Sequence, residues 1–284
     1  MKNILKIVGL FVLMGFSFFY TDKVIEVIRE EDNIMIELNN VKDLYKIEAV
    51  SANVVSNTII PGVNGRVVNI DKSYKEMKSV GKFNKNSIIY DVVRPSVSIS
   101  NNKDKFIIKG NSMKQMVSLV FLVDDDKYLD KINKISIDSE VVFNYFVDYE
   151  FLIDNTTLIK EMSNSEFYSY GNNGKYSPDN LLFSNNLISR ISGNEAVYCL
   201  SSNMDLDVLN LCNSNNLYTL VPSVIAFDNM YSEVSKNLES GSIILFEINK
   251  DTVNNLDIIV NYIKGKGLKI GGLSDLLSEE LINN

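Results

Sequence analysis

The stretch from residue 241 to residue 277 alternates between short apolar runs and an amphipathic segment. Residues 242–246 form an uninterrupted apolar run, which is typical of a strand buried on both faces. Residues 252–263 place apolar side chains at helical spacing, and the glycines that follow can end this helix because glycine readily adopts a left-handed backbone. Residues 268–273 are the next apolar run. The pattern predicts a strand–helix–strand unit.

The same alternation extends back to about residue 116. Predicted helices cover residues 128–135, 155–162, 178–191, 206–212 and 230–238. Strands and helices that alternate in this way indicate a mainly parallel sheet, which is either open or closed into a barrel, and the number of units favours an irregular (β/α) barrel. The predicted strands begin at Val117, Val141, Glu166, Ala196, Leu217, Ser242 and Leu268, and the one that begins at Leu217 extends to residue 224.

The N-terminal segment is apolar. Residues 7–20 carry no charge, and Lys2 and Lys6 precede them. This pattern fits either a cleaved signal peptide or a retained membrane anchor. We favour an anchor, spanning about residues 4–20, because bulky aromatic residues stand where a signal peptidase prefers small ones. The basic residues on the N-terminal side then predict that the rest of the chain lies outside the cytoplasm.

The region between the predicted anchor and the alternating part is less regular. Residues 24–28 and 34–38 resemble strands, residues 72–80 a short helix that ends at Gly81, and residues 87–93 and 106–108 further strands. The sequence therefore predicts three parts: an anchor (1–21), a membrane-proximal α+β region (22–112) and an α/β domain (113–284).

Composition excludes several kinds of function. The chain has 284 residues, of which 45% are hydrophobic, and a formal net charge of −8, which argues against a nucleic-acid partner. It contains no histidine, so the commonest general base and metal ligand is missing. Its two cysteines, Cys199 and Cys212, could form one bridge, but we interpret them as buried free thiols.

Residues 114–277 resemble the polysaccharide deacetylase (NodB homology) family. The likeness rests on VSLVFLVDDDKYLDKI at 117–132, VVFNYFVDYEFLIDNTTLIKEMSN at 141–164, GNNGKYSPDNL at 171–181 and GSIILFEI at 241–248. The resemblance implies an irregular (β/α) barrel, an extracytoplasmic site and a carbohydrate substrate. It also implies a divalent metal such as zinc, held by one Asp and two His, with a second Asp as base and a further His as acid.

The chain departs from the family at each of these positions. The Asp pair falls on Leu122 and Val123, the two metal-binding histidines on Asn173 and Ser177, and the last histidine on Glu247. Asparagine and serine are poor ligands, and nothing in the chain replaces imidazole. We therefore expect neither a metal site nor another cofactor.

A few residues remain as weak candidates for chemistry or binding. A one-residue shift would bring Asp124 and Asp125 to the positions of the Asp pair, although such a run is more typical of a solvated loop. Glu247 could act as a carboxylate at a strand end. The candidates for contacts with a glycan are Tyr170, Tyr176 and Tyr198.

Two hypotheses follow. The first is a membrane-anchored, extracytoplasmic deacetylase-like protein without catalysis, which binds cell-wall glycan or an envelope protein, or has a structural role there. The alternative is a divergent carbohydrate deacetylase that hydrolyses N-acetyl bonds of cell-wall glycan with carboxylates alone. Dependence of activity on a metal distinguishes them.

Overall fold

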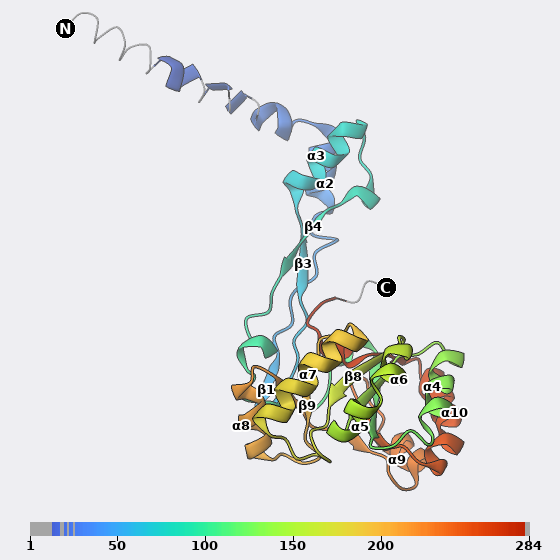
Figure 1. The fold of residues 1–284 in the computed structure, drawn as a ribbon. Coiled ribbons are helices and arrows are strands. Elements are labelled where there is room, and N and C mark those ends of the chain that lie inside the picture. Colours follow the sequence, from blue (N-terminus) through green and yellow to red (C-terminus); the bar gives the residue numbers. More distant parts are fainter. Residues whose placement is uncertain (1–12, 18–19, 22, 25, 282–284) are drawn as a thin grey trace, which may run out of the picture. The chain divides into compact units, whose positions relative to one another are not determined.

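The computed structural model describes residues 13–17, 20–21, 23–24 and 26–281 (Figure 1). The chain divides into two compact units. The smaller unit consists of Met1–Ala49 and Gly65–Val93, and the larger unit of Val50–Asn64 and Arg94–Asn284. Residues 50–64 and 94–112 thus pack within the larger unit, whereas the sequence-based division assigns them to the membrane-proximal region.

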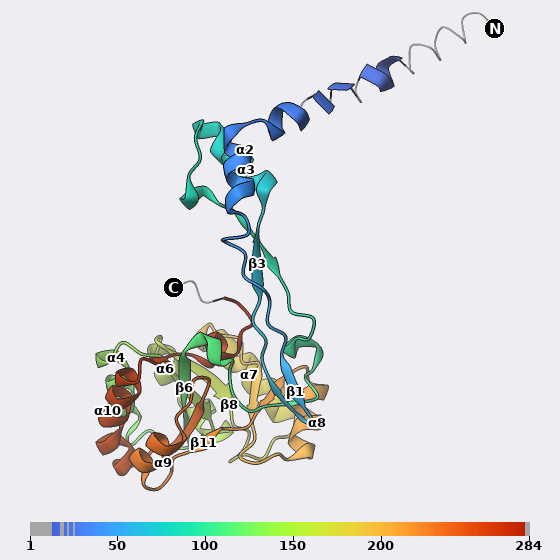
Figure 2. The same cartoon turned by 180° about the vertical axis from the view of Figure 1, so that it is seen from behind.

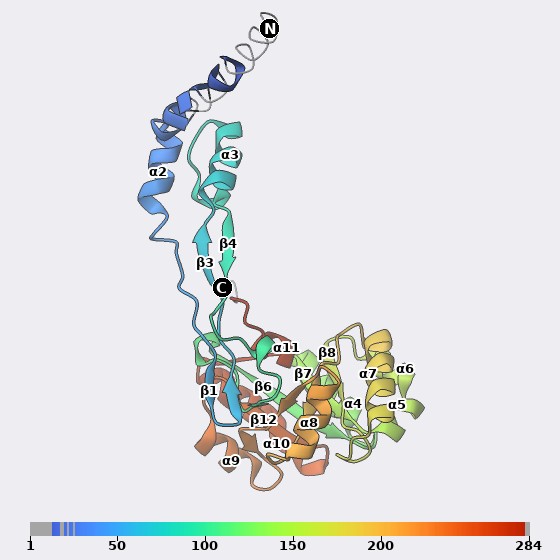
Figure 3. The same cartoon turned by 90° about the vertical axis from the view of Figure 1, so that its left-hand side faces the viewer.

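The described part of the smaller unit includes a pair of packed helices and a two-stranded sheet. Helix α2 (Asn33–Val41) packs on α3 (Ile70–Val80), and β3 (Gly65–Val68) pairs antiparallel with β4 (Tyr90–Val93) (Figure 3). The predicted helix at 72–80 is confirmed, with Gly81 at its end in the left-handed conformation (φ 80°). The buried core of this unit consists of Ile34, Leu38, Met77 and Ile88.

The predicted strand at 34–38 is wrong, because these residues lie in α2. The apolar residues there satisfy both the two-residue period of a strand and the spacing of a helix. Asp32 decides between them: its side chain accepts a hydrogen bond from Ile34 N and caps the helix. The described residues of the predicted strand at 24–28 are helical as well.

Most of the predicted anchor, residues 4–20, lies outside the described residues. Within the described part of the chain, no helix is both long enough and apolar enough to cross a bilayer. The membrane anchor therefore stays a prediction.

The larger unit is built around the buried strand β6 (Met116–Val123). One sheet has the order β11-β12-β6-β7-β8, and β13 also pairs with the start of β6. All these pairs are parallel, which confirms the predicted winding. Strands β6, β8 and β11 of this sheet are labelled in Figure 2. The other strands are β7 (Phe143–Val147), β8 (Ser165–Ser169), β11 (Val224–Ile225), β12 (Ile243–Glu247) and β13 (Lys269–Ile270).

Helices connect these strands. The six helices predicted after residue 116 are confirmed within a few residues, while a further helix, α5, begins directly after β7. The helices are α4 (Leu129–Asp138), α5 (Tyr149–Asp154), α6 (Thr156–Glu161), α7 (Pro178–Ser192), α8 (Leu206–Ser214), α9 (Met230–Asn237), α10 (Lys250–Gly265) and α11 (Leu273–Leu277). The predicted strand at 268–273 is only partly correct, because β13 is short and Leu273 begins α11.

A second sheet has the order β1-β2-β5-β10-β9. Its strands are β1 (Asn53–Val55), β2 (Thr58–Ile60), β5 (Phe106–Ile107), β9 (Tyr198–Leu200) and β10 (Tyr218–Leu220). The predicted strand at 217–224 is therefore wrong as a single element, since its two ends belong to different sheets. Pro222 lies between them and has no N–H for a strand ladder.

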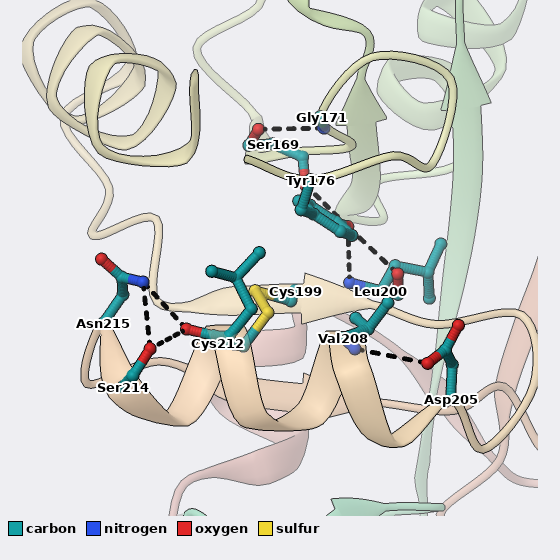
Figure 4. The surroundings of a disulfide bond; sticks show 11 residues. Ser169, Gly171, Tyr176, Cys199, Leu200, Asp205, Val208, Cys212, Ser214 and Asn215 are labelled. Carbon is teal, nitrogen blue, oxygen red and sulfur yellow. Dashed lines mark hydrogen bonds between the residues drawn. A yellow bond between two sulfur atoms is a disulfide. The ribbon is translucent and has the colours of Figure 1, made fainter. Parts of the chain in front are cut away.

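Side chains join the two sheets where β8 and β9 adjoin without pairing. The side-chain amide of Asn194 bonds the edge of β8 as the backbone of a neighbouring strand would. Phe167 N donates to Asn194 Oδ1 at 3.2 Å, and Asn194 Nδ2 donates to Phe167 O at 3.0 Å. The Tyr176 hydroxyl accepts from Leu200 N at 2.9 Å and lies 3.0 Å from Leu200 O (Figure 4). These contacts satisfy backbone groups that a closed barrel would pair directly.

Cys199 in β9 and Cys212 in α8 form a disulfide (Figure 4). The interpretation of these residues as free thiols is therefore wrong. Both side chains are fully buried, as the sequence analysis expects, but the fold brings their Cα atoms to 6.4 Å, within bonding range. Spacing along the chain cannot reveal this, because the helix must fold back over the strand.

Lys114 is a buried cation that holds the C-terminal segment. Its side chain is 8% exposed, and its Nζ donates to the carbonyl groups of Asp275 and Ser278 and, at 2.9 Å, to Ser278 Oγ. Burial lowers the pKa of this amine to about 8, although the carboxylates of Asp275, Glu280 and Glu279 oppose the shift.

This shift predicts a pH dependence of stability. Between pH 8 and 10.5 the amine is neutral in the folded chain but still charged in the unfolded chain, so the unfolded chain binds more protons. The free energy of unfolding of the parent, relative to that of Lys114→Met, should therefore rise by about 2 kcal/mol from pH 8 to pH 10. Denaturant titrations of both proteins at each pH measure the difference. A difference that stays constant or falls with pH would contradict this assignment.

Candidate functional site

Several predicted candidates meet at the carboxyl ends of β6, β7 and β12. Parallel strands end at the same edge of a sheet, and ligands of α/β folds gather there. The strand ends and the loop after β8 border a pocket of about 260 Å³. Its lining residues are Leu122, Val123, Asp124, Asp125, Asp148, Tyr170, Asn173, Glu247 and Ile248. We call this pocket the rim pocket.

The strand register places Glu247 beside Leu122, so both side chains lie on the same face of the sheet. Val123 follows and is 1% exposed. The two positions that the resemblance assigns to the Asp pair therefore do line the rim pocket, but with aliphatic side chains. Such side chains can neither bind a metal nor accept a proton.

Asp148 is a rim residue that the sequence analysis missed. Asp148 is 9% exposed and caps the N-terminus of α5, where its Oδ1 accepts from Glu150 N at 2.9 Å. Its Oδ2 accepts from Asn173 N at 2.7 Å. Its carboxylate thereby fixes the loop after β8 to the end of β7. The available signal was an aspartate between an apolar strand and a helix, which is a typical N-cap position.

Asn173 and Ser177 have different surroundings. Asn173 lies in the rim pocket with a left-handed backbone (φ 48°) and an exposed side chain. Ser177 is not among the lining residues, and its hydroxyl accepts from Asn180 N at 3.3 Å, which caps α7. Neither residue offers a strong ligand to a metal.

Asp124 and Asp125 are exposed and lie in the loop after β6, where Asp125 Oδ1 accepts from Lys127 N at 3.0 Å. Together with Asp148 and Glu247 they make the rim pocket acidic. Over the part of the chain that the structure describes, no three His, Cys, Asp or Glu side chains approach closely enough to hold a metal ion. The donors do not fit zinc, which prefers imidazole and thiolate, because the chain has no histidine and both cysteines are bonded to each other.

Of the three tyrosines considered for glycan contacts, only Tyr170 lines the rim pocket. It is half-buried; burial raises the pKa of its hydroxyl, and the Glu247 carboxylate raises it further, so the hydroxyl stays a hydrogen-bond donor. The hydroxyl of Tyr176 is hydrogen-bonded to the backbone N–H and carbonyl of Leu200. Tyr198 lines a different cavity.

No family model matches the chain. One curated protein, YlxY of Bacillus subtilis, which is described as uncharacterized, is 27% identical over 241 residues, covering 78% of this chain and 75% of its own length. This similarity supports a common origin, but it indicates no function because the relative is itself described as uncharacterized.

Solved structures are more informative about the fold. BA3943 of Bacillus anthracis, described as a family 4 carbohydrate esterase (CE4) pseudoenzyme, matches with a TM-score of 0.68 and 23% identity over 89% of this chain and 97% of its own. A mutant of BA3943 described as having restored enzymatic activity also matches with a TM-score of 0.68 and 23% identity, over 88% of this chain and 100% of its own.

PdaA of Bacillus subtilis, described as a CE4 enzyme, matches with a TM-score of 0.52 and 19% identity over 61% of this chain and 84% of its own. The segments that carry the resemblance in sequence include residues that line the rim pocket, among them Val123, Asp148 and Asn173, and also run into helices α4, α5, α6 and α7. The chain therefore has the α/β fold of the CE4 polysaccharide deacetylases, as the resemblance predicts.

Proposed function

We propose that this protein is a catalytically inactive relative of the polysaccharide deacetylases that binds cell-wall glycan at the rim pocket. One observation carries the proposal. Four of the five positions that match the metal-binding and catalytic residues of the family line this pocket, yet they hold Leu122, Val123, Asn173 and Glu247, and the fifth, Ser177, caps α7 outside it. The architecture of the site is kept, while its chemistry is not.

The chemical argument concerns the amide bond. Hydrolysis of an N-acetyl group needs a Lewis acid to polarise the acyl oxygen and a group that protonates the leaving amine. The rim pocket offers neither imidazole nor a set of metal ligands, and imidazole is the side chain that changes protonation near neutral pH. What it does offer is a tyrosine beside carboxylates, which suits recognition of hydroxyl and amide groups on a sugar.

The structural similarity to BA3943 supports the proposal that this protein is inactive. BA3943 is described as a pseudoenzyme, and a mutant of it as active again. By analogy, we propose that this fold has lost activity through its side chains, while the backbone that would position a catalytic set is retained.

We further propose that the protein works outside the cytoplasm, attached to the membrane by residues 4–20. The Cys199–Cys212 disulfide supports an oxidising compartment, since such bonds are rare in the cytosol. Lys2 and Lys6 on the N-terminal side of the apolar segment support the same orientation.

Cosedimentation of the full-length chain with insoluble cell-wall glycan tests the binding role. We expect the parent to bind and Tyr170→Ala to bind about tenfold more weakly, because it removes the aromatic surface of the rim pocket. Tyr262→Ala is the matched control, since this half-buried tyrosine lies on α10, does not line the rim pocket, and should leave binding unchanged. A parent that stays in the supernatant would rule out glycan binding.

One observation favours the alternative, a divergent deacetylase that hydrolyses N-acetyl bonds with carboxylates. Asp124, Asp125, Asp148 and Glu247 line the same pocket, and hard cations do bind carboxylates, although weakly when few ligands converge. This alternative requires acetate release that a metal stimulates and that Glu247→Gln abolishes.

A further inference from the structure

A larger cavity, of about 710 Å³, lies at the other end of the strands in the larger unit. Its walls come from residues 94–100, from the C-terminal segment 274–280, and from strands β8, β9 and β10. Tyr198 and Tyr218 are the first residues of β9 and β10, whereas the rim pocket lies at strand carboxyl ends. We call this cavity the tyrosine cavity. Its size is that of a small-molecule site.

Three tyrosine rings form one wall of the tyrosine cavity. The ring centroids of Tyr168 and Tyr198 are 5.2 Å apart in an edge arrangement, and those of Tyr198 and Tyr218 are 5.8 Å apart. The face of an aromatic ring carries partial negative charge and attracts cations. Lys103 of the chain itself already lies over the Tyr218 ring, with its Nζ 4.7 Å from the centroid.

Tyr198 differs from Tyr168 in how its hydroxyl is bonded. The residue is only 5% exposed, and no described residue forms a hydrogen bond with its hydroxyl, which is nevertheless not sealed from solvent. In contrast, the hydroxyl of Tyr168 donates to Glu166 Oε2 at 2.7 Å. The Tyr198 hydroxyl, open to the tyrosine cavity on a residue that is otherwise buried, is thus free to bond a ligand atom that enters the cavity.

The charges around the tyrosine cavity are mainly negative. Of the described residues that line it, Glu195, Glu279 and Glu280 are acidic and Arg94 alone is basic. Glu279 is held in place, accepting from Ile99 N at 3.0 Å, while the described residues provide no ion pair to Glu195 or Glu280.

The pKa values of two tyrosine hydroxyls in this cavity are also affected by the nearby carboxylates. Burial is the main cause that raises the pKa of Tyr198 and Tyr218, and the carboxylates of Glu166 and Glu279, respectively, raise these pKa values further. Burial disfavours a charge of either sign at these hydroxyls, and only the smaller contribution from the two carboxylates favours a cation.

We propose that the tyrosine cavity binds a small organic cation with a primary ammonium group. The ammonium donates a hydrogen bond to the Tyr198 hydroxyl oxygen, the tyrosine rings contact its carbon skeleton, and the glutamates compensate its charge. This site is separate from the rim pocket, and the proposal does not depend on glycan binding there.

Titration of the full-length chain with 1,5-diaminopentane tests the proposal, with calorimetry and tyrosine fluorescence as readouts. The chain has no tryptophan, so tyrosine emission is directly observable. We expect the diamine to bind and its N,N′-diacetyl derivative, which has the same carbon chain without charge, to bind at least tenfold more weakly. Raised salt should weaken the binding of the diamine.

Substitutions locate the binding. Tyr198→Phe should weaken it about tenfold, and it should fold normally because the hydroxyl bonds no described residue. Glu195→Gln combined with Glu280→Gln should also weaken binding several-fold, whereas Arg94→Gln should tighten it. Tyr170→Phe in the rim pocket is the control and should have no effect. Absence of binding by the parent, equal binding of the diacetyl derivative, or unchanged binding by a folded Tyr198→Phe would overturn the proposal.

Discussion

Replacing Phe121 with alanine is expected to destabilise the larger unit by about 3–5 kcal/mol. Phe121 lies in the middle of β6 and is fully buried. Its ring centroid is 5.0 Å from that of Phe143, 5.7 Å from that of Tyr145 and 5.3 Å from that of Phe246. The cavity left by alanine would thus interrupt a set of contacts that joins three neighbouring strands, and close-packed interiors refill such cavities only partially.

Denaturant unfolding of the two proteins, followed by far-ultraviolet circular dichroism, measures the difference. Phe183→Ala is the matched control, since this ring on α7 is 49% exposed and its removal should cost less than about 1 kcal/mol. If Phe121→Ala were as stable as Phe183→Ala, β6 could not be the centre of the core.

Removing the disulfide, with Cys199→Ala and Cys212→Ala together, is expected to destabilise the larger unit by about 3 kcal/mol. The bond closes a loop between residues 13 apart, and a loop of that size restricts the unfolded chain by about this amount. The bond also ties α8 to β9, next to the place where the second sheet meets the first (Figure 4).

Two measurements check this prediction. Thiol titration of the unfolded, unreduced chain should find no free thiol, and the reduced parent should unfold at about the same denaturant concentration as the double variant. Two free thiols per chain, in protein isolated from its native compartment, would instead restore the interpretation of Cys199 and Cys212 as free buried thiols.

Most of the larger unit follows from local sequence pattern. Strand β6 and helix α10 could be predicted because their buried side chains recur at the spacing of a buried strand and of an amphipathic helix. The errors occur where tertiary context decides. Residues 34–38 fit both periods, and only the cap from Asp32 selects the helix. The run at 217–224 is divided because its two ends pair with strands that are distant in sequence.

The candidate site was partly predictable for the same reason. Leu122, Asn173 and Glu247 could be placed together because strand ends of a parallel sheet share one edge. Asp148 was missed because its role depends on a loop that folds back to offer the N–H of Asn173. Tyrosines show no period that reveals whether they face a ligand, and so Tyr176 and Tyr198 could not be separated from Tyr170.

Acetate release tests the loss of catalysis most directly. The full-length chain is incubated with N-acetylated cell-wall glycan and zinc, cobalt or manganese, and compared with a variant that carries Leu122→Asp, Val123→Asp, Asn173→His, Ser177→His and Glu247→His. We expect no release and no tight zinc binding by the parent, whereas release by the variant would show that only the side chains are missing. Metal-stimulated release by the parent, abolished by Glu247→Gln or by Asp124→Asn with Asp125→Asn, would contradict the account.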